Sequence, residues 1–170
     1  MDALEALRQM HGEAKAAFQR IEQASPDERG GLWARLRPEL LAHEQIEERF
    51  VYDPVLRDRG SDPMLTNWHR RHEQEVEQAN ALIDEIGRLD PREARFVERV
   101  GELHRALAAH IAMEENEFWP RIRQVWGADR LEQAGRQVEA ARTAATAAAG
   151  VSGAVGSIAE SIKQALDRMS

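Results

Sequence analysis

Apolar residues recur at every third or fourth position along most of the chain, which is the spacing of one face of an α-helix. Three times a side-chain hydrogen-bond acceptor stands directly before a proline, as at a typical helix start: Ser25-Pro26, Asp62-Pro63 and Asp90-Pro91. These breaks predict four long helices, the second with a kink or restart near Pro38, over about residues 2–24, 27–58, 63–87 and 91–126. Because short connections make successive helices antiparallel, we expect an all-α fold, an antiparallel four-helix up-down bundle.

The chain changes character after Gly127. An alanine-rich helix follows, then the flexible break GVSGAVG at residues 150–156, and finally a short amphipathic helix whose apolar face includes Ile162 and Leu166. We therefore expect a bundle over residues 1–127 and an Ala-rich helical C-terminal extension over residues 128–170. The apolar face must be covered, which favours packing of the extension on its own bundle, with self-association or a protein partner as the alternative. A chain that ends near Gly127 keeps every candidate ligand, so we expect the site to be independent of the extension.

Composition and charge exclude several classes of protein. The formal net charge of −7 and the lack of a Lys/Arg cluster argue against nucleic acid as a partner, because such a surface needs clustered positive charge. The sequence contains no cysteine, which excludes disulfides and thiolate metal sites. It has no apolar run of about 18 residues and no signal-peptide pattern, so we expect a cytoplasmic protein that does not bind membranes.

Most of the histidines fall on the helix stripes that should face the bundle core. They come from all four helices: His11, His43, His69, His72 and His110. A single inward histidine is most often a hydrogen-bonded core residue, but one on each of four helices favours a shared site. His104 lies off the main stripe, and we expect it beside such a site rather than in it.

Two glutamates, Glu47 and Glu114, also fall on inward stripes, and these stripes carry no Lys or Arg. Burying an ionised carboxylate without a compensating charge costs several kcal/mol, so each glutamate needs a cation. Glu47 stands four residues after His43, and Glu114 four residues after His110, so each pair lies on one helix face, one turn apart. The repeat predicts two equivalent metal half-sites that face each other across the bundle. In a bundle without metal, both glutamates would need raised pKa values.

The carboxylates and aromatic residues near these pairs have different expected roles. Glu44 lies only about 100° around the helix from His43 and can also turn inward. Glu48 and Glu115 lie about 140° from their histidines, so we expect them in surface pairs. Tyr52 and the tryptophans are expected to pack rather than to take part in chemistry.

Two other metal motifs do not fit the chain. Ferritin-like di-iron bundles need Glu-x-x-His on two helices, and no histidine here has a glutamate three positions before it. The stretch HEQIE at residues 43–47 begins like the His-Glu-x-x-His helix of zinc proteases, but Glu47 replaces the second histidine. A hydrolase is therefore not expected.

The combined pattern resembles the hemerythrin-like, HHE cation-binding domains. It has a histidine on the first helix, His-x-x-x-Glu-Glu segments followed by a proline on the second and fourth, and histidine on the third, over about residues 1–126. The resemblance implies a non-heme di-iron centre with two Fe ions per chain, oxo- or hydroxo-bridged when oxidised. Glu47 and Glu114 are the bridging carboxylates it implies. The full ligand set it implies is His11, His43, Glu47, His72, His110 and Glu114.

The sequence departs from the oxygen-carrying hemerythrins at two places. It has Glu114 where those proteins have an aspartate, and it spaces His69 and His72 at i, i+3 where they have i, i+4. His69, His72 or both therefore remain candidate metal ligands. Glu44 matches instead the hemerythrin-like domains that sense iron, in which this position supplies another carboxylate ligand.

Two classes of function follow from the resemblance. The first is reaction with oxygen or peroxide, as an oxidase, a catalase-like peroxide-decomposing enzyme or a reversible carrier, with dioxygen or peroxide as the partner. The second is an iron- or oxygen-sensing module whose extension reports the state of the centre to another protein. The sequence assigns no catalytic residue.

Overall fold

The computed structural model describes residues 1–59, 61–151 and 158–169. These residues form helices and helical turns in the following order: α1 (Ala3–Gln23), α2 (Pro26–Glu47), η1 (Glu48–Tyr52), α3 (Asp53–Arg59), α4 (Pro63–Ile86), α5 (Ala94–Met113), η2 (Glu114–Phe118), α6 (Trp119–Val125), α7 (Ala128–Val151) and α8 (Ile158–Asp167). Most of the predicted break at residues 150–156 lies outside the described residues, and α7 continues through Val151.

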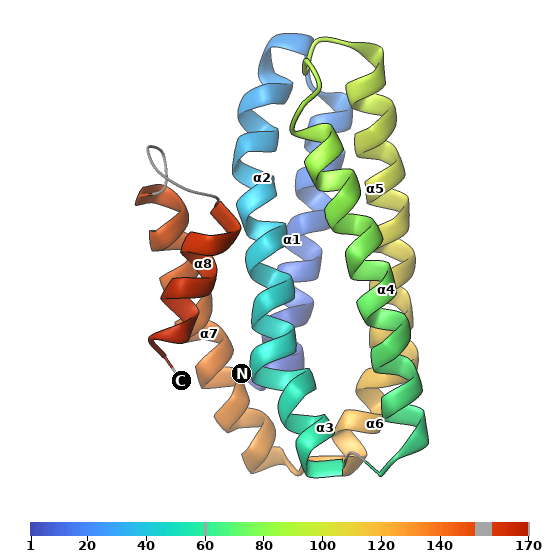
Figure 1. Ribbon diagram of the computed structural model, residues 1–170, viewed down its shortest axis with the longest axis vertical. Helices are drawn as coiled ribbons and strands as arrows, with labels where there is room; N and C mark the ends of the chain where they lie inside the picture. The colour runs from blue at the N-terminus through green and yellow to red at the C-terminus, as the bar shows by residue number, and fades with distance from the viewer. Residues whose placement is uncertain (60, 152–157, 170) are drawn as a thin grey trace.

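Helices α1, α2, α4 and α5 run alternately up and down and form a bundle, with α7 and α8 along the flank of α2 (Figure 1). The structure confirms the all-α, antiparallel bundle expected from the spacing of apolar residues. In the part of the chain that the structure describes, no helix has the length and apolar content that a membrane span requires.

Side chains before the predicted helix starts hold two of them in place. Asp62 accepts a hydrogen bond of 3.0 Å from the Met64 N–H at the start of α4. The Ser25 hydroxyl donates to Glu28 over 2.6 Å at the start of α2. The fourth helix starts three residues after the expected position, because Asp90 accepts from the Arg92 N–H in a turn and α5 begins at Ala94.

The predicted long second and fourth helices are each interrupted by a π-helical turn. In η1 the Asp53 N–H bonds to the Glu48 carbonyl, and in η2 the Trp119 N–H bonds to the Glu114 carbonyl. A bond from residue i+5 to residue i widens the turn by one residue. Each wide turn ends two residues before a proline, Pro54 or Pro120, whose ring needs space over the preceding turn. By contrast, α2 continues as one helix through Pro38, where a kink or restart was expected.

The core consists of two apolar clusters, one toward each end of the bundle. One contains Leu7, Ile46 and Trp119, and the other contains Phe18, Leu40 and Leu103. The inward histidines fall between the two clusters, one on each of the four helices of the bundle: His11, His43, His72 and His110. A polar layer is therefore enclosed by apolar packing on both sides.

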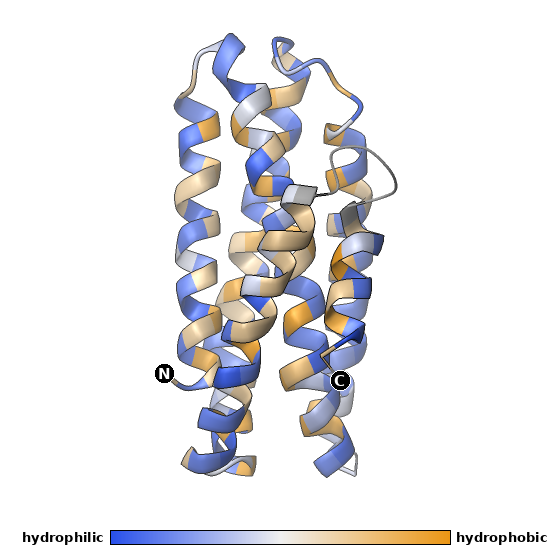
Figure 2. Cartoon of the chain, turned by 90° about the vertical axis from the view of Figure 1, so that its left-hand side faces the viewer, coloured by the Kyte–Doolittle hydropathy of each residue, from blue (hydrophilic) through white to orange (hydrophobic). Residues whose placement is uncertain are grey.

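The C-terminal extension packs on its own bundle, in agreement with the arrangement that its apolar face favoured. Leu131, Val138, Ile162 and Leu166 are buried in the same cluster as the α1 residue Leu4. Figure 2 shows α7 and α8 next to each other against the bundle. The division of the chain at Gly127 into two parts, and independence of the site from the extension, stay predictions.

Gly135 of α7 lies against the beginning of the chain and gives a test of this packing. A Cβ atom at this position would stand 2.5 Å from the Met1 carbonyl oxygen and 2.9 Å from the Asp2 carbonyl carbon. We expect Gly135→Ala to lower the free energy of unfolding by about 1–3 kcal/mol, because α7 must move away from α1. Urea unfolding followed by circular dichroism measures the change.

The matched control is Gly31→Ala in α2, where a Cβ atom meets nothing within 4 Å. Since alanine favours helix, this change should leave the protein unchanged or stabilise it by about 0.5–1 kcal/mol. Equal effects of the two substitutions would contradict the close contact between α7 and the N-terminus.

Candidate metal centre

The polar layer contains two groups of metal-ligand side chains. His11, His43 and Glu47 form the first group, and His72, His110 and Glu114 form the second. Within each group one nitrogen or oxygen atom per residue lies within 4.8 Å of the others. The structure thus brings together, as two half-sites, all six residues of the implied ligand set.

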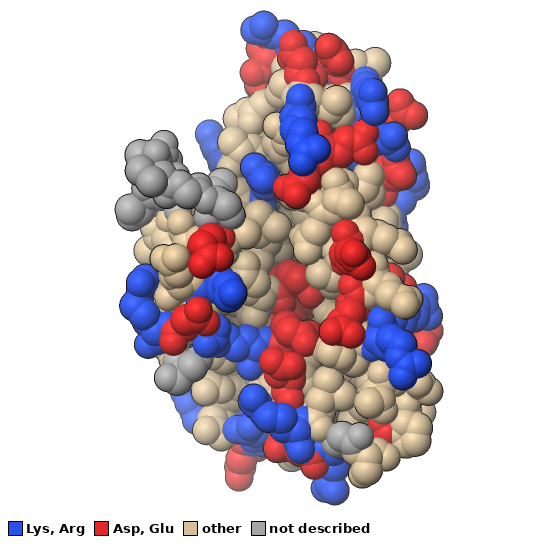
Figure 3. Space-filling model, in the orientation of Figure 1, with Lys and Arg blue, Asp and Glu red and all other residues tan. Residues whose placement is uncertain are grey.

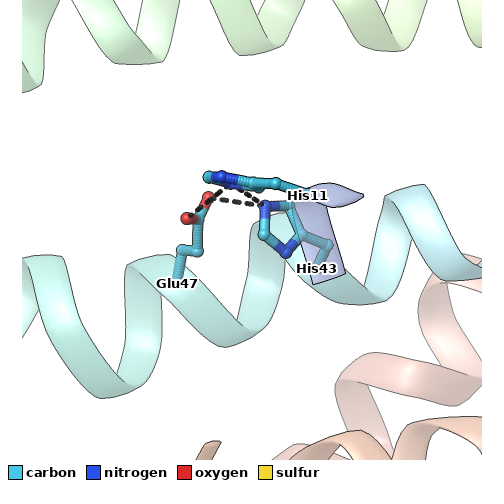
Figure 4. A group of neighbouring side chains, drawn as sticks. All are labelled: His11, His43 and Glu47. Carbon is cyan, nitrogen blue, oxygen red and sulfur yellow. Dashed lines mark hydrogen bonds and ion pairs between the residues drawn. The ribbon is translucent and has the colours of Figure 1, made fainter. Parts of the chain in front are cut away.

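The first group joins α1 and α2. His43 and Glu47 stand one turn apart on α2, with 3.2 Å between His43 Nε2 and a Glu47 carboxylate oxygen. His11 comes from α1, and its Nε2 lies 3.0 Å from His43 Nε2 and 3.6 Å from Glu47. Figure 4 shows the three side chains turned toward one another.

The second group joins α4 to the end of α5. His110 Nε2 lies 3.1 Å from Glu114 Oε1, and His72 Nδ1 lies 3.7 Å from the same oxygen. The other oxygen of Glu114 lies 3.4 Å from His11 Nε2, in the first group. Glu114 therefore stands between the two groups, the position that a bridging carboxylate needs.

Glu44 approaches the second group from α2. Its Oε1 lies 2.9 Å from His72 Nε2, and its side chain is 25% exposed, whereas that of His72 is 1% exposed. The Glu44 side chain therefore points toward the centre, as its position on the helix allowed.

Outer carboxylates orient two of the histidines. Glu115 Oε1 lies 2.9 Å from His11 Nδ1, and Glu75 Oε2 lies 2.7 Å from His110 Nδ1. A carboxylate on one ring nitrogen fixes the ring and favours a bare nitrogen on the other side, which is the usual support of a metal-ligating histidine. Glu115 also pairs with Arg8, so it makes the expected surface pair and a contact with the centre.

Several buried polar atoms in the layer have no partner in hydrogen-bond geometry, although most of them lie near an atom of a histidine or a carboxylate. They are His43 Nδ1, Glu47 Oε2, both ring nitrogens of His72, His110 Nε2 and Glu114 Oε2. Leaving a buried polar atom unsatisfied costs about 1–3 kcal/mol, so a cluster of them indicates a missing partner. Imidazole nitrogens and carboxylate oxygens fit a transition-metal ion as that partner.

Charge in the layer is balanced between histidines and carboxylates. Burial lowers the pKa of His110, but Glu114 and Glu75 outweigh burial and raise it to about 10. Burial raises the pKa of Glu47, but His43 and His11 hold it well below its usual range. A bundle without metal was expected to raise the pKa of Glu47. The pKa of Glu47 is lowered instead. Metal ions compete with protons for these nitrogens, so binding must release protons.

Tyr52 and Trp119 take part in the layer, although the sequence pattern indicated packing only. The Tyr52 hydroxyl lies 3.1 Å from Glu47 Oε1 and 2.9 Å from Glu114 Oε1, and the Trp119 indole N–H donates to it over 3.1 Å. Burial, together with the charges of Glu114 and Glu47, raises the pKa of Tyr52 well above 10, so the hydroxyl keeps its proton. The π-helical turns explain why the sequence pattern did not predict these contacts. Tyr52 follows Glu47, and Trp119 follows Glu114, by five residues, a spacing that falls on one face only in a π-helical turn.

Two other histidines lie outside both groups. His69 was a candidate ligand, but its Nε2 lies 2.7 Å from Glu48, and its ring centroid is 6.3 Å from that of His72. His104 pairs with Glu22 over 2.9 Å and stacks on Phe18. Of the two helix α4 candidates, the structure brings His72 into the layer.

A four-helix bundle with paired His/His/Glu groups in its core belongs to the class of helical metal-binding proteins. Residues 2–122 match the hemerythrin HHE cation binding domain, so the chain belongs to this family. A solved structure with a similar fold is that of a hemerythrin HHE cation binding domain-containing protein from Mycobacterium kansasii. It is 23% identical, with a TM-score of 0.70 over 97% of this chain and 99% of that chain. No curated protein matches the chain.

The contact between Tyr52 and Trp119 can be tested by unfolding. We expect Tyr52→Phe to lower the free energy of unfolding by about 1–3 kcal/mol, because it leaves the buried Trp119 N–H without an acceptor. The experiment is a double-mutant cycle with Trp119→Phe, measured in denaturant. Since each single change breaks the same contact, the double variant should lose less than the sum of both losses. Additive losses would show that the hydrogen bond does not contribute.

Proposed function

We propose that the chain is a non-heme di-iron protein that reacts with dioxygen or peroxide. The observation that carries the proposal is the pairing of two His/His/Glu groups through Glu114, whose oxygens lie near histidines of both groups. Two ions that share a carboxylate suit this arrangement better than one ion, because six nitrogen and oxygen ligands on four helices surround two positions. Bound iron would supply redox chemistry with oxygen species.

A cavity next to the layer supports a small neutral reactant. It has a volume of about 230 Å³ and reaches His43 and His110, and its walls include Phe18, Leu40 and Leu107. Apolar walls favour uncharged molecules over ions, because an ion would lose its hydration there. Dioxygen and hydrogen peroxide are both uncharged and small enough to enter.

The protein's own groups would control protons at the centre. The Tyr52 hydroxyl keeps its proton and lies within hydrogen-bond distance of Glu47 and Glu114, so it limits the basicity of both carboxylates. Glu75 and Glu115 hold the His110 and His11 rings from outside. A catalase-like or oxidase activity would depend on these groups to hold and orient the ligands of the centre, and hydrogen peroxide disproportionation is the activity to assay first.

An iron- or oxygen-sensing or reversible oxygen-binding module is the second candidate, and contacts of α8 favour the sensing form. Gln45 donates to the Ala159 carbonyl over 3.3 Å, and Arg49 pairs with Asp167 over 2.6 Å. Gln45 and Arg49 are each within two residues of Glu47 on α2 and η1. A shift of α2 at the centre would therefore reach the extension directly.

Metal content tests the paired site. The protein as purified is expected to hold about two iron ions per chain, measured by elemental analysis. Glu114→Ala should lower the iron content per chain by more than the loss of a ligand to one ion would, because the carboxylate lies between both groups. The control is Glu117→Ala, an exposed glutamate of the same turn, which should keep full iron content. Full iron in the Glu114 variant, or one tightly held zinc in the original protein, would overturn the proposal.

Reversibility of the oxygen reaction separates an enzyme from a carrier. Glu44 adds negative charge beside His72, and this favours the ferric state and hinders reversible binding. We expect the reduced protein to oxidise in air and not to return when oxygen is removed, as followed by its optical spectrum. Glu44→Ala should restore part of the reversibility, whereas Glu77→Ala, an exposed change on the neighbouring α4, should not. Spontaneous return of the unmodified protein to its reduced form would identify a carrier.

A further inference from the structure

A third cluster of ligand-type side chains lies outside the two groups. Glu48, Asp53 and His69 each offer one ligand atom, and these atoms lie within 4.8 Å of one another. His69 Nε2 lies 2.7 Å from Glu48 Oε1. Glu48 and Asp53 line a groove of about 1040 Å³, and Figure 3 shows acidic side chains gathered in a hollow down the middle of this face.

The π-helical turn η1 creates this cluster. Glu48 and Asp53 are five residues apart, and in a regular α-helix their side chains would point about 140° away from each other. In η1 the Asp53 N–H bonds to the Glu48 carbonyl, so the two residues are instead one turn apart. The turn thus places two carboxylates together and opposite His69 of α4.

His72 connects this outer cluster with the metal centre. Its side chain is only 1% exposed, and neither ring nitrogen has a partner in hydrogen-bond geometry. His72 is among the residues that line the groove, and its Nε2 lies 3.7 Å from Glu48 Oε2 and 2.9 Å from Glu44 Oε1. One carboxylate, Glu48, therefore reaches outward to His69 with one oxygen and inward toward His72 with the other.

We propose that Glu48, Asp53 and His69 form a divalent-cation site that captures metal ions from solvent and passes them inward through His72 and Glu44. The passage rests on the proposed function, because the metal centre is its destination, but the outer site itself does not. One imidazole and two carboxylates suit Fe²⁺ and Mn²⁺.

The exposure of the ligands suits capture rather than storage. Side-chain exposure falls from 33% at Glu48 to 18% at His69 and 1% at His72. Three protein ligands leave the remaining positions of an ion to water, so the ion stays exchangeable. A gradient from hydrated to enclosed ligands lets an ion lose its water in steps.

Equilibrium binding of Mn²⁺ tests the outer site. Iron-loaded protein is titrated with Mn²⁺, and free Mn²⁺ is measured by electron paramagnetic resonance. We expect one bound Mn²⁺ to be lost in Asp53→Asn and in His69→Gln, and retained in Glu77→Gln, which removes the same charge elsewhere in the groove. Asp53 is exposed, so its substitution should leave the fold intact. Equal Mn²⁺ binding by all variants would overturn the site.

Iron loading tests the passage inward. Protein stripped of metal is mixed anaerobically with limiting Fe²⁺, and samples are oxidised at intervals to read the ferric absorbance. Asp53→Asn should load roughly tenfold more slowly and reach the same final absorbance, because it loses the local attraction but keeps the centre. Equal slowing by Glu77→Gln, or unchanged loading by Asp53→Asn, would overturn the passage.

The two proposals fail in different ways. If the centre does not bind iron, no variant develops ferric absorbance, yet Asp53→Asn still loses one Mn²⁺ relative to the original protein. If the outer site is wrong, iron content and absorbance are normal while the Mn²⁺ isotherms of all variants coincide.

Discussion

Two carboxylates with no solvent exposure, Glu47 and Glu114, impose the constraint on which the rest of the structure depends. An ionised carboxylate in an apolar bundle is costly unless positive charge and hydrogen-bond donors surround it. The bundle meets this requirement with one histidine from each of four helices and with the Tyr52 hydroxyl between both carboxylates. Because apolar clusters close the layer on both sides, water is a poor substitute for these partners.

The two π-helical turns are the local device that satisfies this constraint. Each begins at or directly after a buried glutamate, and the residue five positions after that glutamate reaches the layer: Tyr52 after Glu47, and Trp119 after Glu114. In a regular helix these side chains would point away from their glutamates. π-Helical turns are rare in proteins. Here they bring the Tyr52 hydroxyl and the Trp119 indole to the carboxylates. The same turn, one residue further along, pairs Glu48 with Asp53.

Much of the fold and the six-residue layer was predictable because both depend on regular helical periodicity. Apolar stripes and the Asp62-Pro63 start located α4, and the i, i+4 spacing located His43/Glu47 and His110/Glu114. Predictions failed where the chain leaves that period. The start of α5 and the role of Tyr52 depend on turns, which a count of 100° per residue does not include.

Two hollows of different character meet at the metal centre. The cavity inside the bundle has apolar walls such as Leu40 and Leu107, whereas the groove over α2 and α4 is lined by Glu48 and Asp53. Apolar walls disfavour ions, whereas Glu48 and Asp53 attract cations locally, in a groove whose lining also includes Arg49, Arg57, Arg130 and Lys163. Glu44 lines both hollows and contacts His72. Under the two proposals, Glu44 at this junction would accept an arriving cation and would then limit the access of a neutral reactant to the filled centre.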